Sequence, residues 1–185
     1  LRRRMGGPGT PVDKGLEPFR GRPMAAWVID RLASQVDELL VSANRNEARY
    51  ARLGPRLQVV ADRIPGFRGP LAGLHAAMTA ARHPWVLSAP CDSPFLPEDL
   101  VMRMAAVVAS KRVPLGVARS GDREQSAFLL AHRSLAPGIA AFLATGESRV
   151  GLWYAPLERA VVDFDEPARF RNINTRDDLA RFGDG

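Results

Sequence analysis

The stretch LAGLHAAMTAARHPWVLSAPCD, residues 71–92, decides the fold class of this chain. Its first part, Leu71–Arg82, is rich in alanine and is predicted to form a helix, whereas Trp85–Ala89 is a short apolar run that is predicted to form a buried strand. A helix that leads directly into a buried strand is the repeating unit of α/β proteins. We therefore look for the same unit on either side of this stretch.

The helix-then-strand step recurs in both directions along the chain. The expected pairs are a helix after Pro23 with a strand at Leu39–Val41, a helix at Glu47–Arg52 with a strand at Leu57–Val60, and a helix at Glu98–Ala109 with a strand at Leu115–Ala118. In the last third we expect strands at Ala127–Ala131 and Ala160–Phe164, and helices near Leu135–Leu143, Arg149–Tyr154 and Arg176–Arg181. This alternation predicts a three-layer α/β/α, Rossmann-like fold with a mixed, mainly parallel sheet.

The composition fits one globular domain over residues 1–185. Of the 185 residues 46% are hydrophobic, and no repeat, low-complexity tract or linker interrupts them. Cys91 is the single cysteine, so no disulfide framework can form and we expect a cytoplasmic location. Residues 1–7 lack the apolar core of a signal peptide and no run of about 18 apolar residues occurs, so we expect no membrane partner.

The positive charge is concentrated at one end of the chain. The formal net charge is +6, and residues 1–23 carry six basic side chains against two acidic ones. A compact basic cluster among glycines suits a polyphosphate better than a long DNA backbone, which usually needs an extended basic stripe. A solvated, frayed N-terminus would carry the same charge, and the charge alone does not separate these interpretations.

The N-terminal glycine-rich segment is the first candidate for phosphate binding. It contains Arg4-Met5-Gly6-Gly7 and Val12-Asp13-Lys14-Gly15-Leu16, separated by Pro8–Pro11. Glycines let backbone N–H groups approach phosphate oxygens, while lysine and arginine supply the opposite charge. The segment lacks Walker spacing, and a flexible surface loop is the competing interpretation.

A second candidate is Asp92, which follows the predicted strand Trp85–Ala89 within Pro90-Cys91-Asp92-Ser93-Pro94. The flanking prolines stop the strand and fix the turn. Mg²⁺ is held by one or two carboxylates together with substrate phosphates, so one rigid aspartate is enough to seat the metal of a nucleotide. Capping of the turn or of the next helix is the alternative role, for which Asp99 competes.

Further polar residues follow other predicted strands. Ser42 and Asn44 follow Leu39–Val41, and Asp62 follows Leu57–Ala61. Ligands of open α/β sheets bind beyond the carboxyl ends of the strands, so these side chains are expected to face one crevice. The segment Gly69-Pro70-Leu71-Ala72-Gly73 begins a helix beside them, and its small residues would let a base or a phosphate approach the backbone, although tight packing explains the same glycines.

Two other catalytic schemes are excluded by the residues. His75, His83 and His132 are isolated, and no Cys-x-x-Cys or His-Glu-x-x-His pattern for zinc occurs. Ser93 and Ser148 lack the glycine pattern of a nucleophile elbow, so a serine hydrolase is not expected.

Taken in order, these motifs resemble those of molybdenum cofactor guanylyltransferases. The resemblance runs over nearly the whole chain and rests on Arg4–Gly7, Val12–Leu16, Asn44-Arg45, Gly69–Gly73, Pro90-Cys91-Asp92 and Asn172-Ile173-Asn174-Thr175. It implies a Rossmann-like nucleotidyltransferase fold. It also implies an Mg²⁺-dependent enzyme that transfers GMP from GTP to the phosphate of molybdopterin or molybdenum-molybdopterin, with release of pyrophosphate.

The resemblance also implies roles for residues of this sequence. Lys14, Asp92 and Arg4 would be catalytic, Asp92 would bind the metal, and Asn172 and Asn174 would lie on the molybdopterin side. GTP would be contacted by Leu1, Gly6, Gly7, Lys14, Ser42, Asn44, Asp62, Gly69, Pro70 and Asp92. Ser42 stands where some family members have asparagine. We expect a monomer whose partners are the two substrates, with molybdoenzyme-maturation proteins as further partners.

The chain departs from the family at its front. The family opens with a buried strand that runs into Leu-Ala-Gly-Gly, whereas only Leu1 precedes the arginines here. Either further residues belong beside Leu1, or the chain is truncated and loses a central strand and much of the phosphate cradle. Pro8–Pro11 is an insertion relative to the family and could alter closure of the loop.

Two alternatives to guanylyl transfer stay open on the sequence. A related enzyme could transfer CMP to molybdopterin, or a nucleotide to another small molecule such as a sugar phosphate. From a different class, the basic N-terminus could serve a nucleic-acid-binding module. The expectation is no nucleic-acid partner, because the chain lacks aromatic residues interleaved with its basic ones.

Overall fold

The computed structural model describes residues 13–62, 64 and 69–183. The candidate residues Leu1, Arg4, Gly6 and Gly7, and the Pro8–Pro11 stretch, lie outside these residues. The elements are η1 (Lys14–Leu16), β1 (Pro18–Phe19), β2 (Arg22–Pro23), α1 (Met24–Ala33), β3 (Leu39–Ser42), α2 (Glu47–Ala51), β4 (Leu57–Val60), α3 (Pro70–Ala80), β5 (Trp85–Ser88), α4 (Leu100–Lys111), β6 (Leu115–Ser120), β7 (Arg123–His132), η2 (Arg133–Leu135), α5 (Ala136–Ala144), α6 (Val150–Tyr154), β8 (Ala160–Phe164), η3 (Pro167–Phe170) and α7 (Arg176–Gly183).

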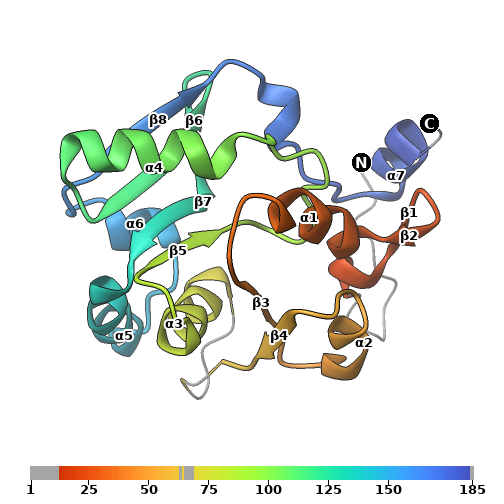
Figure 1. Cartoon of the computed structure of the whole chain (residues 1–185), viewed down its shortest axis with the longest axis horizontal. Helices are drawn as coiled ribbons and strands as arrows, with labels where there is room; N and C mark the ends of the chain where they lie inside the picture. The colour runs from red at the N-terminus through yellow and green to blue at the C-terminus, as the bar shows by residue number, and fades with distance from the viewer. Residues whose placement is uncertain (1–12, 63, 65–68, 184–185) are drawn as a thin grey trace.

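The larger sheet has four strands in the order β5-β7-β6-β8 (Figure 1). β7 runs antiparallel to both of its neighbours, β5 and β6, whereas β6 and β8 are parallel. β5, β6 and β8 therefore share one direction, and β7 is the strand that makes the sheet mixed. The prediction of a mixed sheet is confirmed.

Helices cover both faces of this sheet, which gives the three predicted layers. Helix α4 lies on one face, and α3, α5 and α6 lie on the other (Figure 1). Successive side chains of β7 point to opposite faces. Phe128 and Leu130 pack in the core beneath α4, while Leu129 and Ala131 pack in the core beneath α3 and α5. A strand buried on both faces needs a continuous apolar run, and the sequence supplies one.

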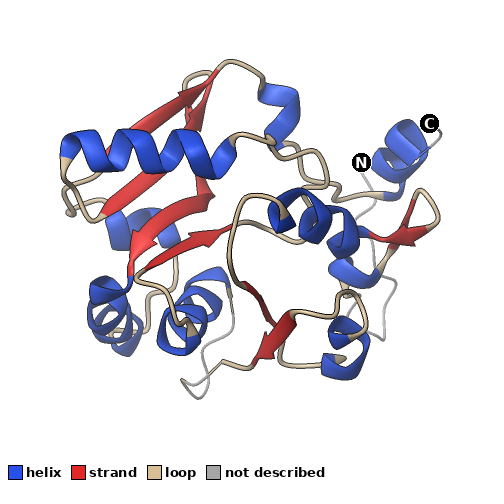
Figure 2. Cartoon of the chain, viewed as in Figure 1, coloured by secondary structure: helices blue, strands red, loops and turns tan. Residues whose placement is uncertain are grey.

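A separate parallel pair, β3 and β4, lies beside the larger sheet (Figure 2). Helix α1 connects the two parts, because Val28 packs with the core under α4 while Ala25 and Ile29 pack with the β3–β4 side. In the described part of the chain, no strand pairs with the edges of β3 and β5 that face each other.

The C-terminal segment returns to the N-terminal half of the molecule. Ile173 is fully buried and packs with Phe19 and Met24. Arg20 Nε donates a hydrogen bond of 3.0 Å to the carbonyl of Phe182, so α7 lies beside the β1–β2 hairpin (Figure 1). This return brings residues 172–174 next to η1 and to the turn after β5.

None of the helices in the described ranges has the length and apolar character needed to span a bilayer.

Candidate functional site

Lys14 and Asp92, the two residues predicted to carry the chemistry, form an ion pair. Lys14 Nζ lies 3.4 Å from Asp92 Oδ2 and donates a hydrogen bond of 2.6 Å to Asn174 Oδ1. The Asp92 side chain is 11% exposed and that of Lys14 is 42% exposed. The Lys14 ammonium can therefore contact an anionic ligand while it stays beside Asp92. Asp99, rather than Asp92, occupies the N-cap position of α4, although its side chain makes no capping hydrogen bond, so Asp92 does not cap this helix.

The segment Asn172–Asn174 fixes the turn that carries Asp92. The Ile173 backbone N–H donates to the Asp92 carbonyl at 2.8 Å, and Ser93 Oγ donates to Asn172 Oδ1 at 2.6 Å. Asn174 then accepts from Lys14. The two asparagines thus lie along the Lys14–Asp92 pair, and their assignment to the molybdopterin side stays a prediction.

A second polar cluster lies at the carboxyl ends of β3 and β4. Ser42 Oγ donates to Asp62 Oδ1 at 3.2 Å, and Asn44 Nδ2 donates to Asp62 Oδ2 at 2.7 Å. The Asp62 backbone N–H donates in return to Asn44 Oδ1 at 2.8 Å. The Asp62 carboxylate is therefore oriented by two donors and remains exposed enough to accept hydrogen bonds from a ligand.

The start of α3 closes against this cluster. Gly69 has a φ of +143°, a conformation that only glycine adopts easily, and Pro70 occupies the first turn of the helix. A Cβ on Gly73 would lie 2.8 Å from Ser42 Oγ. The helix therefore approaches Ser42 as closely as a hydrogen atom at position 73 allows.

A cavity of about 590 Å³ joins the two polar clusters. Its polar end is lined by Ser42, Asn44, Asp62, Gly69, Pro70, Asp92 and Asn172. The structure thus brings together side chains from the ends of β3, β4 and β5, as the crevice hypothesis requires. A volume of this size is within the range of small-molecule sites.

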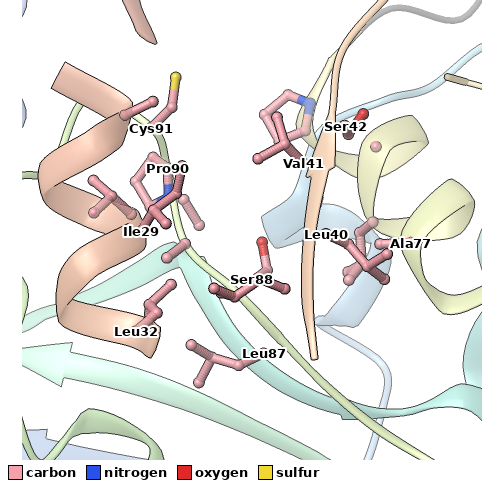
Figure 3. A pocket seen from close by; sticks show the side chains of 18 of the residues that line it. Ile29, Leu32, Leu40, Val41, Ser42, Ala77, Leu87, Ser88, Pro90 and Cys91 are labelled. Carbon is pink, nitrogen blue, oxygen red and sulfur yellow. The ribbon is translucent and has the colours of Figure 1, made fainter. Parts of the chain in front are cut away.

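The same cavity continues between β3 and β5 as an apolar slot. Figure 3 shows Ile29 and Leu32 of α1 on one side, Leu40 and Val41 of β3 on the other, and Leu87 of β5 beneath them. A second cavity of about 210 Å³ lies at the amino ends of the same strands, where Leu39 and Trp85 line it. Because a nucleotide is polar and charged, we assign the ligand site to the polar end and not to the slot.

Asp13, Asn46 and Tyr50 form a third cluster that the sequence analysis did not single out. Tyr50 Oη donates to Asp13 Oδ1 at 2.5 Å, and Asn46 Nδ2 donates to Asp13 Oδ2 at 2.9 Å. Asp13 precedes Lys14 directly, so it was visible within the Val12–Leu16 motif. No sequence pattern, however, links it to partners more than thirty positions away.

Cys91 is exposed and is one of the residues that line the cavity (Figure 3). The protein atoms that surround its sulfur, together with the carboxylates of Asp92 and Asp13, raise the pKa of the thiol to about 12. A thiol with this pKa is almost fully protonated at neutral pH and is a weak nucleophile. Cys91 therefore lacks the lowered pKa of a reactive cysteine, and its side chain lies beside Gly15.

Asp92 is the residue suited to hold a metal ion. Among the described residues, no three His, Cys, Asp or Glu side chains gather into a metal site made by protein alone. A nucleotide-bound Mg²⁺ does not require one, because phosphates and water complete its shell around one or two carboxylates. Asp92, which lines the cavity and is held by Lys14, fits that donor set.

Comparison with known proteins identifies the family. Residues 3–160 match the model of the MobA-like NTP transferase domain. A molybdenum cofactor guanylyltransferase from Shewanella putrefaciens is 44% identical over 183 residues, which cover 98% of this chain and 91% of the relative. One from Vibrio cholerae is 41% identical over 181 residues, covering 97% of this chain and 85% of the relative.

Solved structures support the fold. The molybdopterin-guanine dinucleotide biosynthesis protein A from Archaeoglobus fulgidus superposes with a TM-score of 0.77 at 21% identity, covering 99% of this chain and 92% of that one. A CMP:2-keto-3-deoxy-manno-octonic acid synthetase in complex with CTP superposes with a TM-score of 0.73 at 14% identity, covering 97% and 93%. The predicted nucleotidyltransferase fold is thereby confirmed. On the match of the family model and on the identity to these relatives, the chain belongs to the molybdenum cofactor guanylyltransferase family, whose fold is that of the MobA-like NTP transferases.

Proposed function

We propose that this chain transfers GMP from GTP to the phosphate of molybdopterin or molybdenum-molybdopterin and releases pyrophosphate. The observation that carries the proposal is Asp92 after β5, which is paired with Lys14 of η1 and lines the same cavity as Asp62, in a chain 44% identical to a named guanylyltransferase. One end of the cavity offers the Asp92 carboxylate for a metal, and the Lys14 ammonium beside it is available for phosphates. The other end offers oriented hydrogen-bonding groups for a nucleoside.

The reaction needs positioning and neutralisation of charge more than proton transfer. An oxygen of the acceptor phosphate forms a bond to the α-phosphorus of GTP, and the bond from this phosphorus to the oxygen that bridges to the β-phosphorus breaks. The electron pair of that bond leaves with pyrophosphate. A phosphate monoester is already anionic near neutral pH, so the acceptor requires no dedicated base.

Lys14 is suited to the leaving group. Its ammonium is held by Asn174 and Asp92 yet is partly exposed, so it can stabilise the negative charge that accumulates toward pyrophosphate. Arg4, outside the described residues, is proposed to assist it on the evidence of the sequence motif alone. Asp92 would hold the Mg²⁺ of the nucleotide, and the ion would supply neutralisation of the phosphate oxygens.

The substitution Asp92→Ala tests this assignment. We expect guanylyl transfer by the variant to fall by about 100-fold or more at saturating Mg²⁺. Asp163→Ala is the matched control, because it removes an exposed carboxylate of β8 that pairs with Arg119 of β6. Near wild-type turnover of Asp92→Ala would remove Asp92 from the metal role.

The choice of guanine rests on Asp62 and Asn44 and on the named relatives. We propose that this cluster holds the guanosine part of GTP, since a carboxylate with free lone pairs can accept from the N–H and O–H groups of a nucleoside. Because one protein of the same fold was solved in complex with CTP, the fold alone does not select the base. Thermal-shift titration with GTP, CTP, UTP and ATP is expected to give the largest stabilisation with GTP, and a preference for CTP would overturn the choice.

A monomeric state, a cytoplasmic location and handover of the product to molybdoenzyme-maturation proteins stay proposals on the sequence. Size-exclusion chromatography with light scattering tests the first of these.

A further inference from the structure

We propose that Asp13 is a positioning residue for Lys14: it fastens the turn η1 to helix α2 and so sets the point from which Lys14 reaches its ligand. This inference rests on the proposed function of Lys14. Both carboxylate oxygens of Asp13 are engaged, Oδ1 by Tyr50 Oη at 2.5 Å and Oδ2 by Asn46 Nδ2 at 2.9 Å. Arg45 Nε lies 3.7 Å from Oδ2 and balances the charge.

The side of α2 that faces Asp13 is arranged for this contact. Asn46 adopts a left-handed conformation with a φ of +57° at the N-cap of α2, yet its side chain does not cap that helix. The side chain donates to Asp13 instead. Asparagine adopts this conformation more readily than most non-glycine residues, and here its side chain is held by the Asp13 carboxylate.

Tyr50 supplies the most buried of these contacts. The residue is 4% exposed, and burial together with the hydrogen bond to Asp13 raises the pKa of its hydroxyl. The hydroxyl therefore stays protonated and donates to the carboxylate over the physiological pH range. A short hydrogen bond between a buried donor and a charged acceptor is directional and holds its partner closely.

The turn itself is pressed against Tyr50. A Cβ on Gly15 would lie 2.5 Å from Tyr50 Oη and 3.1 Å from Cys91 Sγ, so η1 lies between α2 and the turn after β5 with no space to move inward. The Leu16 backbone N–H donates to the Asp13 carbonyl at 2.9 Å and closes the turn.

Lys14 is consequently held at both ends. Its backbone is fixed through Asp13 to α2, and its ammonium is fixed by Asn174 and Asp92. The engaged oxygens of Asp13 point to Tyr50 and Asn46, so Asp13 acts through Lys14 and not on the substrate. A displacement of about 1 Å in a charged catalytic group can lower a rate by as much as 100-fold.

A double-mutant cycle tests the proposal. Asp13→Ala and Tyr50→Phe are each prepared in the wild-type chain and in the Lys14→Met chain, and kcat, the KM for GTP and the calorimetric Kd of GTP with Mg²⁺ are measured. In the presence of Lys14 we expect each variant to lower kcat roughly tenfold. In the Lys14→Met background the same changes should alter kcat by less than about twofold, because the group they position is gone. Asp13→Asn keeps one acceptor for Tyr50 and should recover part of the loss.

Tyr154→Phe is the matched control. Tyr154 is also 4% exposed, and its hydroxyl is paired with a carboxylate, Glu124, but it is the last residue of α6 and does not line the cavity. The Tyr154→Phe variant should lower Tm about as much as Tyr50→Phe does and leave kcat unchanged.

Equal losses of kcat with and without Lys14 would overturn the proposal, as would an unchanged kcat in Asp13→Ala. If the wild-type chain failed to transfer GMP, the proposed function would fall. In that case the Kd values for GTP, measured for the same variants with and without Lys14, would still show whether Asp13 and Lys14 are coupled.

Discussion

At the scale of single residues, the site depends on contacts between positions that are far apart in the chain. Lys14 and Asp92 could be named as candidates from the sequence, because a lysine among glycines suits phosphates and an aspartate at a strand end suits a metal ion. The bond from Lys14 to Asn174 spans 160 positions, and the bond from Tyr50 to Asp13 spans 37. Local patterns carry no record of such pairs, so the sequence pointed to Lys14, Asp92 and Asn174 without showing that Asn174 holds Lys14, and it gave no sign of Tyr50.

Gly73→Ala tests the closest approach in the nucleoside end of the site. The added methyl group would meet Ser42 Oγ at 2.8 Å and displace Ser42 from Asp62. We expect the KM for GTP to rise about fivefold, which corresponds to about 1 kcal/mol of lost binding. Gly138→Ala is the control, because a Cβ there meets no heavy atom within 4 Å and the residue is also helical. Steady-state kinetics that give both variants the same KM would contradict this explanation of Gly73.

At the scale of elements, the order of helices and strands was predictable because each step depends on local periodicity. The residues at which each helix or strand begins and ends were harder to predict. β7 was expected at Ala127–Ala131 but runs over Arg123–His132, because its polar first residues pair with β6 through Arg119–Glu124 and Ser120–Arg123. The hairpin β1–β2 was not predicted at all: its turn places Arg20 and Gly21 at φ values of +48° and +74°, and arginine gives no signal for such a turn. Backbone pairing and turn conformation leave little trace in a hydrophobic pattern.

Glu38 joins two elements through a charge, which makes their association dependent on pH. Its carboxylate accepts from the Arg82 backbone N–H at 2.9 Å and from Arg82 Nε at 3.0 Å, and so ties the start of β3 to the end of α3. Burial raises the pKa of Glu38, but the hydrogen bonds and the charge of Arg82 outweigh it and hold the pKa below its ordinary 4.5. A carboxyl group with a lowered pKa in the folded state stabilises the protein above about pH 4.5 and loses this contribution as the pH falls through the folded-state pKa.

We therefore expect Glu38→Gln to lower the free energy of unfolding by about 1 kcal/mol at pH 7. The difference from the wild type should shrink as the pH falls below about 4.5, because the wild-type carboxylate becomes protonated. Urea unfolding at pH 7, 5 and 3.5 measures it. Glu98→Gln removes a carboxylate that is 79% exposed and should cost less than about 0.5 kcal/mol. If the difference in the free energy of unfolding between Glu38→Gln and the wild type stayed constant over this pH range, the charge of Glu38 would not be the source of its stabilising effect.

At the scale of the whole molecule, two sheets share one site but no strand ladder joins them within the described residues. Helix α1 packs on both, α3 lies beside β3 and β5, and the segment at residues 172–174 returns to η1. The site is formed where the carboxyl ends of β3, β4 and β5 meet. From the direction of the strands, the sequence predicted that these carboxyl ends lie together. It did not predict the apolar slot between β3 and β5, because the width of that slot depends on how the β3–β4 pair packs against the four-stranded sheet.

The slot has the properties of a place for one more parallel strand. Leu40, Val41 and Leu87 face it, the edges of β3 and β5 that border it have no strand partner in the described part of the chain, and the carboxyl ends of both strands lie toward Asp92.

A chain extended in front of Leu1 by a five-residue apolar strand and a glycine-rich turn should fill the slot. Burial of its side chains, less the cost of ordering them, should give about 2 kcal/mol and raise Tm by roughly 4–8 °C. Hydrogen exchange should slow at the amides of β3 and β5. An extension of equal length made of serine and asparagine should change neither quantity, because it cannot bury apolar surface in the slot. If the apolar extension raised Tm no more than the polar one did, the slot would have to be closed by rearrangement of α1 and α3 instead.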